Sequence, residues 1–305
     1  MKRRFATCAI ATALAACSST TERSPAPIAE ISPLQGRPSA VAVGGGFVWV
    51  ADDARGVVLR LDPSNGTQRG AAIAVSPHPV AIDADESTVW VADRAGTITR
   101  IDTAKAAVTG TPIELGGQVV DVLTDGPLTW VADIESSTVV PIDAASGTPG
   151  ARIAVADGVV RLAAGPTGVW VTNGDHTVAI IDRATRTVGR PITVGPGPIG
   201  VTVNDGVAWI ANGDDGTVSR LDGNDGRPLG APIAVGGTPV VVVLLLGSAW
   251  VVQQDRHTVI RLDALTGNTL GEPVNLGTRP RDAARSNEGV WVVGVDPSAA
   301  VLIRG

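Results

Sequence analysis

The apolar positions of the chain recur with a period of about 40 residues, and each period contains one tryptophan. The tryptophans follow one another at spacings of 41, 40, 40, 39, 41 and 41 residues: Trp49, Trp90, Trp130, Trp170, Trp209, Trp250 and Trp291. Each lies in a short run such as VWVAD, VWVTN or AWIAN, which favours a strand and is apolar at consecutive positions. Consecutive apolar positions indicate a strand that is covered on both faces, so we expect each of these strands to lie between two neighbouring sheets.

Polar and turn-forming residues recur in phase with the tryptophans. An aspartate ends an apolar run twelve or thirteen residues after six of them: Asp62, Asp102, Asp143, Asp182, Asp222 and Asp263. Turn-rich text such as DPSNG or DALTG follows, then a glycine, and then an isoleucine or valine seventeen residues before the next tryptophan. Proline stands eleven residues before five of the tryptophans. Each repeat is therefore predicted to contain four short strands joined by tight turns.

Four antiparallel strands in a unit of about 40 residues are typical of one blade of a β-propeller. We name the strands a to d from the axis outward: strand a precedes the tryptophan, b contains it, c ends at the aspartate and d contains the isoleucine. A ring of blades buries both faces of every sheet. The last repeat stops after strand c, and residues 28–34 form a spare strand d before the first repeat. The sequence predicts an all-β fold, a seven-bladed propeller over residues 28–305, closed by the N-terminal strand completing the last blade.

The repeats resemble the YVTN and NHL-type propellers of bacterial extracytoplasmic proteins over nearly all of residues 28–305. The resemblance rests on the VWVAD run, on third strands of the type TVxRLD at residues 217–222 and 258–263, and on the pair Gly197-Pro198 before a strand a. It implies a ring that binds a ligand or a protein.

The first 27 residues have the pattern of a lipoprotein leader and a tether. Residues 1–16 combine a basic start with a short apolar stretch, as in a secretion signal. The following Leu14-Ala15-Ala16-Cys17 resembles the lipobox of bacterial lipoproteins, in which the cysteine becomes lipidated. The polar text up to residue 27 suits a flexible tether. We predict lipidation of Cys17 and an extracytoplasmic domain held at the cell membrane by its lipid; the alternative is a plain signal peptide with a chance cysteine.

Charge and composition narrow the partners. Removal of residues 1–16 takes the net charge from −6 to −9, and the sequence shows no basic cluster, which argues against nucleic acid and against anionic lipid as a partner of the domain. Outside residues 1–16 the aromatic residues are the seven tryptophans and Phe47, all within strand b, so no aromatic is left to stack on a sugar or a base. With Cys8 removed and Cys17 lipidated, cysteine chemistry is excluded. We expect a monomer, without a cofactor, that touches the membrane only through its anchor.

Residues that break the repeat on strand a, which lines the central channel, are the best site candidates. The residue nine positions before the tryptophan is small in most blades and charged in three. From blade one to blade seven these residues are Ala40, Ala81, Asp121, Arg161, Gly200, Val241 and Asp282. Asp121 and Arg161 come from adjacent blades and are predicted to pair, with Asp282 on the same ring. Two interpretations stay open: either these charges satisfy one another in a wet channel, or they hold a ligand or cation at the channel mouth together with Arg281. Arg279 flanks the group and is included in it.

Histidines and loop carboxylates give weaker candidates. His78 lies in a loop on the same face and is a candidate ligand-binding residue or general base, although no second histidine or glutamate is fixed near it. His176 and His257 occupy one repeat position, before Thr-Val, and are predicted to be surface-turn residues. The b-to-c loops contain carboxylates that either bind a hard cation or are solvated turn residues: Asp52, Asp53, Asp133, Glu135, Asp175, Asp214, Asp215 and Asp255.

The leading hypothesis is a lipid-anchored binding or scaffold module of the cell envelope that takes a protein or a small ligand on its channel face. One alternative is a metal-assisted enzyme resembling streptogramin lyases, a family with a seven-bladed ring that uses a histidine, acidic residues and magnesium. That resemblance lies at the level of the fold, because no motif transfers those residues to this chain. A second alternative is an envelope sensor domain.

Overall fold

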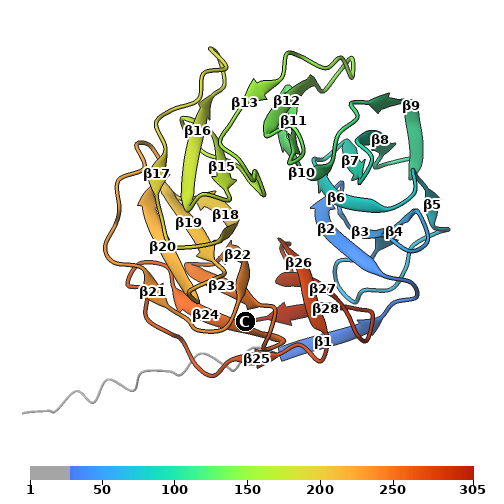
Figure 1. Ribbon diagram of the computed structural model, residues 1–305. Helices are drawn as coiled ribbons and strands as arrows, with labels where there is room; N and C mark the ends of the chain where they lie inside the picture. The colour runs from blue at the N-terminus through green and yellow to red at the C-terminus, as the bar shows by residue number, and fades with distance from the viewer. Residues whose placement is uncertain (1–27) are drawn as a thin grey trace, which may run out of the picture.

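The structure is a computed structural model that describes residues 28–305 as seven four-stranded antiparallel sheets set around a central axis (Figure 1). Residues 1–27, with the predicted signal, Cys17 and the tether, lie outside the described residues. Within residues 28–305 no helix is long and apolar enough to cross a membrane. The predicted all-β, seven-bladed propeller is confirmed.

The strands follow the predicted order in every blade. Blade one contains β2 (Pro38–Gly44), β3 (Phe47–Asp52), β4 (Val57–Leu61) and β5 (Ile73–Ala74). Blade two contains β6 (Pro79–Ala84), β7 (Thr88–Asp93), β8 (Thr97–Asp102) and β9 (Ala107–Glu114). Blade three contains β10 (Val119–Asp125), β11 (Leu128–Asp133), β12 (Thr138–Asp143) and β13 (Ile153–Ala154). Blade four contains β14 (Leu162–Ala164), β15 (Gly168–Asn173), β16 (Thr177–Asp182) and β17 (Ile192–Thr193).

The remaining three blades repeat the arrangement. Blade five contains β18 (Pro198–Asn204), β19 (Val207–Asn212), β20 (Thr217–Asp222) and β21 (Ile233–Ala234). Blade six contains β22 (Pro239–Leu245), β23 (Ser248–Gln253), β24 (Thr258–Asp263) and β25 (Val274–Asn275). Blade seven contains β26 (Arg279–Arg285), β27 (Val290–Val295), β28 (Ala299–Arg304) and β1 (Ile28–Pro33).

Ring closure joins the two ends of the described chain. Strand β1 pairs antiparallel with β28, from Ile28 opposite Arg304 to Pro33 opposite Ala299, and is the outermost strand of blade seven (Figure 1). The Arg304 guanidinium lies 3.0 Å from a Glu30 carboxylate oxygen and 2.9 Å from one of Glu288. The prediction that an N-terminal strand completes the last blade is confirmed.

The tryptophans form the contacts between blades. All seven are at most 1% exposed. Trp49 of blade one lies in a buried cluster with Ile82 and Val89 of blade two, and every other tryptophan likewise belongs to a cluster shared with the following blade. Val48 and Val50, which flank Trp49, belong instead to the cluster with blade seven. The consecutive apolar positions of strand b therefore serve two interfaces, because successive side chains point to opposite faces of the sheet.

The aspartates at the strand ends act as turn caps. Asp52, at the end of β3, is 1% exposed and accepts hydrogen bonds from the backbone N–H groups of Arg37 (3.0 Å) and Ala54 (3.1 Å). Asp133 is 2% exposed and accepts equivalent bonds from Gln118 (2.9 Å) and Glu135 (3.1 Å). The expectation that loop carboxylates are solvated is therefore wrong for these two. They are buried because each ties the turn after strand b to the loop that enters strand a.

A β-bulge marks the entry of strand a in six of the blades. In blade one the register shifts between Pro38 and Ala40, which leaves Ser39 as the extra residue. The same shift occurs in blades two, three, five, six and seven. A bulge bends its strand and redirects the extra side chain, so this position, ten residues before the tryptophan, is where a blade can present a side chain away from the sheet.

Deleting residues 28–33 should strongly destabilise the propeller, because β28 then ends blade seven with an unpaired edge. We expect the midpoint of thermal unfolding to fall by roughly 5–10 °C, at about 2–4 °C for each kcal/mol lost, and the variant to aggregate more readily. Circular dichroism on heating measures the shift. The matched control is deletion of residues 18–27, which removes no described strand; an equal effect of both deletions would contradict the role of β1.

Candidate functional site

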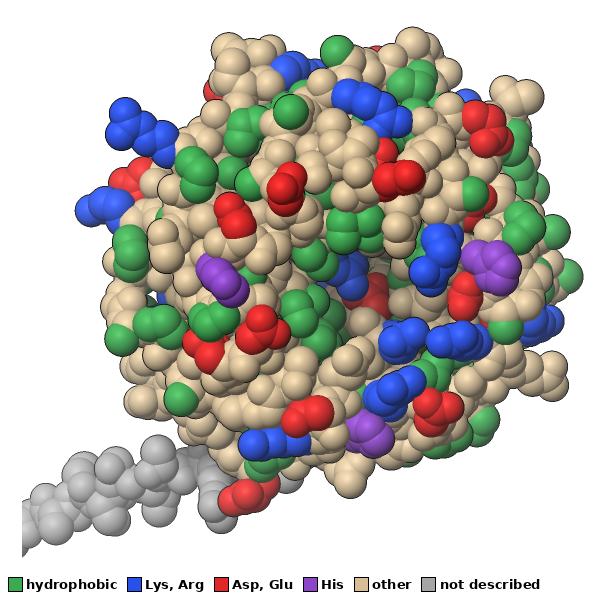
Figure 2. Space-filling model, in the orientation of Figure 1, with side chains coloured by type: hydrophobic (Ala, Val, Ile, Leu, Met, Phe, Trp, Pro, Cys, Tyr) green, Lys and Arg blue, Asp and Glu red, His purple; other side chains and the backbone are tan. Residues whose placement is uncertain are grey.

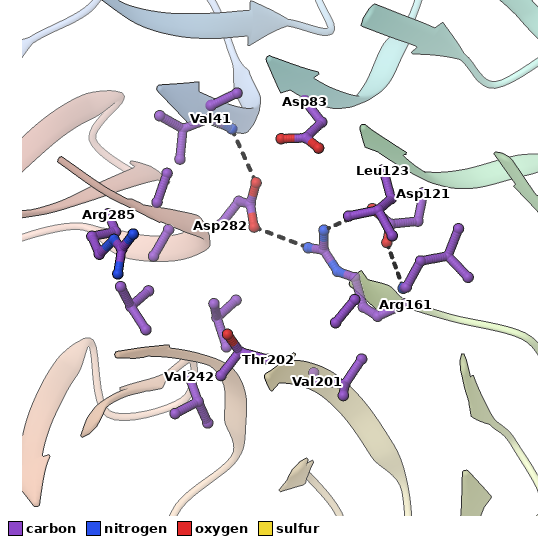
Figure 3. Close-up of a pocket in the computed structure, with 18 of the residues that line it drawn as sticks. Val41, Asp83, Asp121, Leu123, Arg161, Val201, Thr202, Val242, Asp282 and Arg285 are labelled. Atoms are coloured by element: carbon purple, nitrogen blue, oxygen red, sulfur yellow. Dashed lines mark hydrogen bonds and ion pairs between the residues drawn. The ribbon is translucent and has the colours of Figure 1, made fainter. Parts of the chain in front are cut away.

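The centre of the ring contains an ion-pair bridge. Arg161, from blade four, donates to Asp121 of blade three at 3.2 Å and to Asp282 of blade seven at 3.0 Å (Figure 3). The predicted pairing of Asp121 with Arg161 is confirmed. The ion pair with Asp282 was not predicted from the sequence, and it joins blade four to blade seven.

Each channel carboxylate also bonds to the backbone of the following blade. Asp121 accepts from the Leu162 N–H at 2.7 Å, and Asp282 accepts from the Val41 N–H at 3.0 Å. Asp83, a residue of β6 that our sequence reasoning did not single out, accepts from the N–H (2.7 Å) and the hydroxyl (2.8 Å) of Thr124. These bonds satisfy N–H groups of the innermost strands that have no further strand to pair with. The channel charges therefore hold neighbouring blades in register.

The cluster contains three carboxylates and one guanidinium, which pairs with Asp121 and Asp282. Burial raises the pKa of Asp121 to about 6, against the opposing effect of Arg161. Burial also raises the pKa of Asp83. Protein surrounds the carboxyl group of this residue, and part of the residue's surface faces the cavity. The pKa of Arg161 is raised, first by Asp282 and then by Asp121. A permanently charged arginine thus faces more carboxylate charge than it can neutralise.

A cavity of about 380 Å³ adjoins the bridge and is lined by the strand a of every blade. Much of its lining is aliphatic, including Val201 and Val242, with Thr202 and Arg285 as further polar residues (Figure 3). Because Asp121, Arg161 and Asp282 already bind one another and the backbone, the geometry favours the first of the two interpretations, in which the channel charges satisfy themselves.

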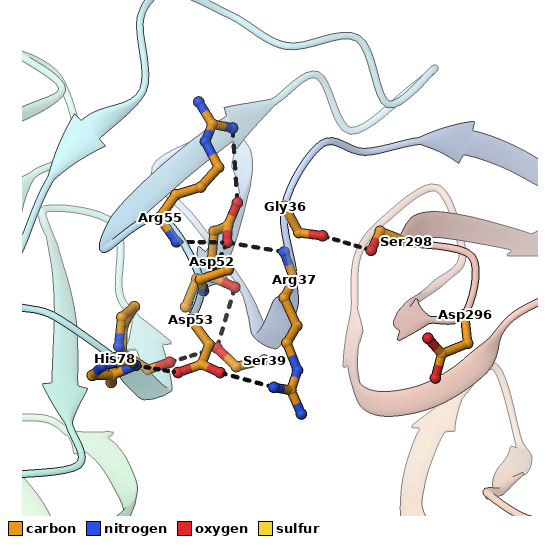
Figure 4. A network of polar contacts seen from close by, with 12 residues as sticks. Gly36, Arg37, Ser39, Asp52, Asp53, Arg55, His78, Asp296 and Ser298 are labelled. Carbon is orange, nitrogen blue, oxygen red and sulfur yellow. Dashed lines mark hydrogen bonds and ion pairs between the residues drawn. The ribbon is translucent and has the colours of Figure 1, made fainter.

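The other predicted site residues lie apart from the bridge, on the face formed by the d-to-a loops and the b-to-c turns. His78 is exposed, and its Nδ1 lies 3.1 Å from the Asp53 carboxylate, which also lies 3.8 Å from the Arg37 guanidinium (Figure 4). Arg279 pairs with Asp296 at 3.2 Å. Arg281 does not join the Asp121–Arg161–Asp282 group; it lines a separate pocket. The predicted set is therefore split into the channel bridge and a rim at the channel mouth.

The rim contains a small pocket of about 220 Å³ between blades seven, one and two. We call it the rim pocket, and its lining residues are Arg37, Ser39, Asp53, Val80, Arg94 and Arg281. Basic side chains gather on this side of the central hollow in the space-filling view (Figure 2). Among residues 28–305, neither Arg94 nor Arg281 has a carboxylate oxygen within 4.0 Å, in contrast to Arg37 and Arg279. The expectation of no basic cluster is wrong, because the fold assembles one from distant residues.

Electrostatics single out Arg281 within the rim pocket. Burial lowers the pKa of Arg281, and the neighbouring Arg37 and Arg279 lower it further. The side chain is only half-buried, so the guanidinium stays charged and in contact with solvent. The pocket thus holds like charges close together without a full set of carboxylate partners.

A positional signal for the rim was present in the sequence. The residues twelve before the tryptophan are basic in three consecutive blades, with Arg279, Arg37 and His78, whereas the other blades have Gln, Gly or Thr there. The residues ten before it are apolar in blades two to six. The first of these two patterns marks Arg37, which was not among the predicted site residues. Arg94 follows strand b in a single blade and had no such signal.

The loop histidines occupy strained turn positions. His176 and His257 have positive φ values of 64° and 56°, at the repeat position where other blades have glycine or serine in the same left-handed conformation. Their prediction as turn residues is confirmed. Within residues 28–305 no group of three or more His, Cys, Asp or Glu side chains is placed to hold a metal ion. The described residues therefore do not fit the magnesium that the resemblance to streptogramin lyases implies, and we derive no step through it.

The raised pKa of Asp121 predicts a measurable pH dependence. Its ordinary value of 3.8 applies to the unfolded chain, and its folded value is about 6. The contribution of this group is therefore complete below about pH 4 and is lost as the pH rises through about 6, by about 3 kcal/mol. Compared with Asp121→Asn, the wild type should lose stability over this window in urea unfolding. The control Asp62→Asn removes a carboxyl whose pKa is lowered to about 2, so its effect has the opposite sign and lies at more acidic pH. A constant difference between wild type and Asp121→Asn from pH 4 to 7 would contradict the prediction.

Comparisons with known proteins agree on the fold. No family model matches the chain, and no curated protein matches its sequence. Among solved structures, a streptogramin B lyase superposes with a TM-score of 0.79 at 15% identity, over 91% of this chain and 98% of the other. Virginiamycin B lyase from Staphylococcus aureus gives 0.78 at 15% identity, over 92% of this chain and all of the other. Kuenenia stuttgartiensis hydrazine synthase gives 0.75 at 15% identity, over 89% and 97%. The chain therefore has a seven-bladed propeller fold like that of virginiamycin B lyase.

Proposed function

We propose that this protein is a lipid-anchored, extracytoplasmic β-propeller that binds an envelope protein or a small ligand on its channel-mouth face. The observation that carries the proposal is the rim pocket, where Arg94 and Arg281 have no carboxylate within 4.0 Å among the described residues. The channel charges below it are bound to one another. A ligand on this face therefore meets its polar contacts at the rim.

The fold makes the rim a stable platform for binding. The loops and turns that carry the rim residues are fixed to buried strands; for example, the Asp53 N–H bonds to the Arg37 carbonyl and the Arg94 N–H bonds to the His78 carbonyl. Side chains on short loops above a rigid scaffold are the usual site of recognition in such folds. The flat faces of the blades, by contrast, are used for packing between blades.

The position of β1 is compatible with the anchor. The Leu14-Ala15-Ala16-Cys17 pattern supports lipidation, and β1 enters the ring at the outer edge of blade seven. An anchor attached upstream of β1 holds the domain from its periphery and leaves the channel mouth accessible. An envelope sensor would use the same face. The lyase-like alternative is supported by the fold alone, and no residue of this chain supports it. A shared fold is not sufficient to assign a reaction.

Site-specific photo-crosslinking in cells that express the protein tests the binding face. A photoreactive residue at position 78, which is exposed on the rim face beside the rim pocket, should give one discrete adduct. The matched controls are positions 246 and 265, in the hairpin after strand a and the turn after strand c of blade six, where the native leucines are 81% and 87% exposed. We expect no adduct from these controls, because they lie in turns at the opposite ends of the strands. Equal adducts from both sets, or none from the rim, would overturn the proposed face.

The anchor is tested separately by Cys17→Ser. Without a thiol to acylate, the variant should move from the membrane fraction to the soluble extracytoplasmic fraction, while the wild type should become labelled by a radioactive fatty acid. Fractionation and labelling measure the two effects. A Cys17→Ser protein that stays with the membrane would rule out the lipid anchor and would leave the binding face untouched.

A further inference from the structure

We propose that the rim pocket binds a single oxyanion group, a carboxylate or a phosphate, through the guanidinium groups of Arg281, Arg37 and Arg94. This inference deepens the proposed function, on which it rests for its role in the cell, by naming the chemical class of the ligand. Arginine is suited to this task because its planar fork donates two parallel hydrogen bonds to a carboxylate or a phosphate.

The pocket lies at the bulges of three consecutive blades, and blades seven and one depart from the repeat there. The bulged residue of strand a is Arg281 in blade seven, Ser39 in blade one and Val80 in blade two, and all three line the pocket. In blades three to six this position is valine or isoleucine. The arginine therefore occupies a position that five of the other six blades fill with an apolar side chain, and the bulge directs it to the pocket instead of to the sheet.

The charge balance of the pocket and its edge is positive. Four guanidinium groups come together, those of Arg37, Arg94, Arg279 and Arg281, and the nearby carboxylates are Asp53 and Asp296. Asp53 is shared, since both Arg37 and His78 contact it. This local excess of positive charge, in a protein whose net charge is −6, favours an anion at this position.

Pocket size and composition limit the ligand to a small group. A cavity of about 220 Å³ accommodates one oxyanion with part of what it is attached to. The lining has no aromatic side chain to stack on a base or a sugar ring. The Ser39 hydroxyl is already committed, since it donates to the Pro79 carbonyl at 2.6 Å. Recognition therefore depends on the arginines and on charge.

Binding of simple anions to the Cys17→Ser chain tests the inference. The probes are inorganic phosphate and acetate, titrated by calorimetry at constant ionic strength set with chloride. We expect one of them to bind, and Arg281→Gln to weaken that binding about ten-fold or more, as loss of a charge-assisted contact predicts. Binding of phosphate alone indicates a phosphorylated ligand, and binding of acetate alone indicates an acidic side chain or a chain terminus; either supports the proposal.

The matched control is Arg285→Gln, which removes the same charge from the opposite end of the same strand, β26. It should bind the probe like the wild type. Arg94→Gln should also weaken binding of the probe. Because Arg94 is exposed, this variant replaces Arg281→Gln in the test if Arg281→Gln does not fold. Failure of both probes to bind the wild type, or equal weakening by Arg285→Gln, would overturn the inference. If the wild type binds an oxyanion but gives no crosslinked partner in cells, the oxyanion site stands and the proposed binding of a partner is rejected.

Discussion

The packing of each tryptophan against the following blade is the interaction on which the whole structure depends. A four-stranded sheet of this length has apolar residues on both faces and cannot be stable alone, because each face needs a neighbour. Trp49, Trp90 and their five equivalents provide a large buried side chain at every interface, in seven clusters that each combine residues of two adjacent blades. The clusters form a closed cycle only when blade seven contacts blade one. The pairing of β1 with β28, which completes the outer edge of blade seven, is thus a consequence of the same requirement.

Closure of the ring brings the seven innermost strands together at the axis, where side chains have little space and few hydrogen-bond partners. Small residues fit there, and the charged exceptions must find one another. Arg161 does so by bridging Asp121 and Asp282, and the backbone N–H groups of Leu162 and Val41 supply the second bond to each carboxylate. Burial of the carboxyl group raises the pKa of Asp121 in spite of its ion pair with Arg161, and the nearby carboxylates of Asp282 and Asp83 raise it further.

The charges of the rim differ from those of the channel, because they are near water and need not be balanced by other charges of the protein. In five blades the same backbone hydrogen bond joins the b-to-c turn to the d-to-a loop, so the chain can change the side chains there without changing the scaffold. Blades seven, one and two use this freedom to bring arginines together, while the other blades carry neutral residues at the equivalent positions. A regular frame with local exceptions is how a repeat protein acquires a specific surface.

The sequence alone determined the period, the strand order, the seven blades and the closing strand, because these depend on apolar positions and turns that recur at fixed intervals. It also predicted the pair Asp121–Arg161, since equal positions in adjacent blades are neighbours in any propeller. Only the tertiary structure decided that Asp282 completes this pair, that Asp83 joins the cluster, and that Arg37, Arg94 and Arg281 share a pocket. Val41 and Asp282 are 241 residues apart in the chain, and they meet because the ring closes. Contacts across the axis and over the rim depend on the curvature of the ring and on side-chain direction at the bulges, and neither is specified by the local pattern of residues.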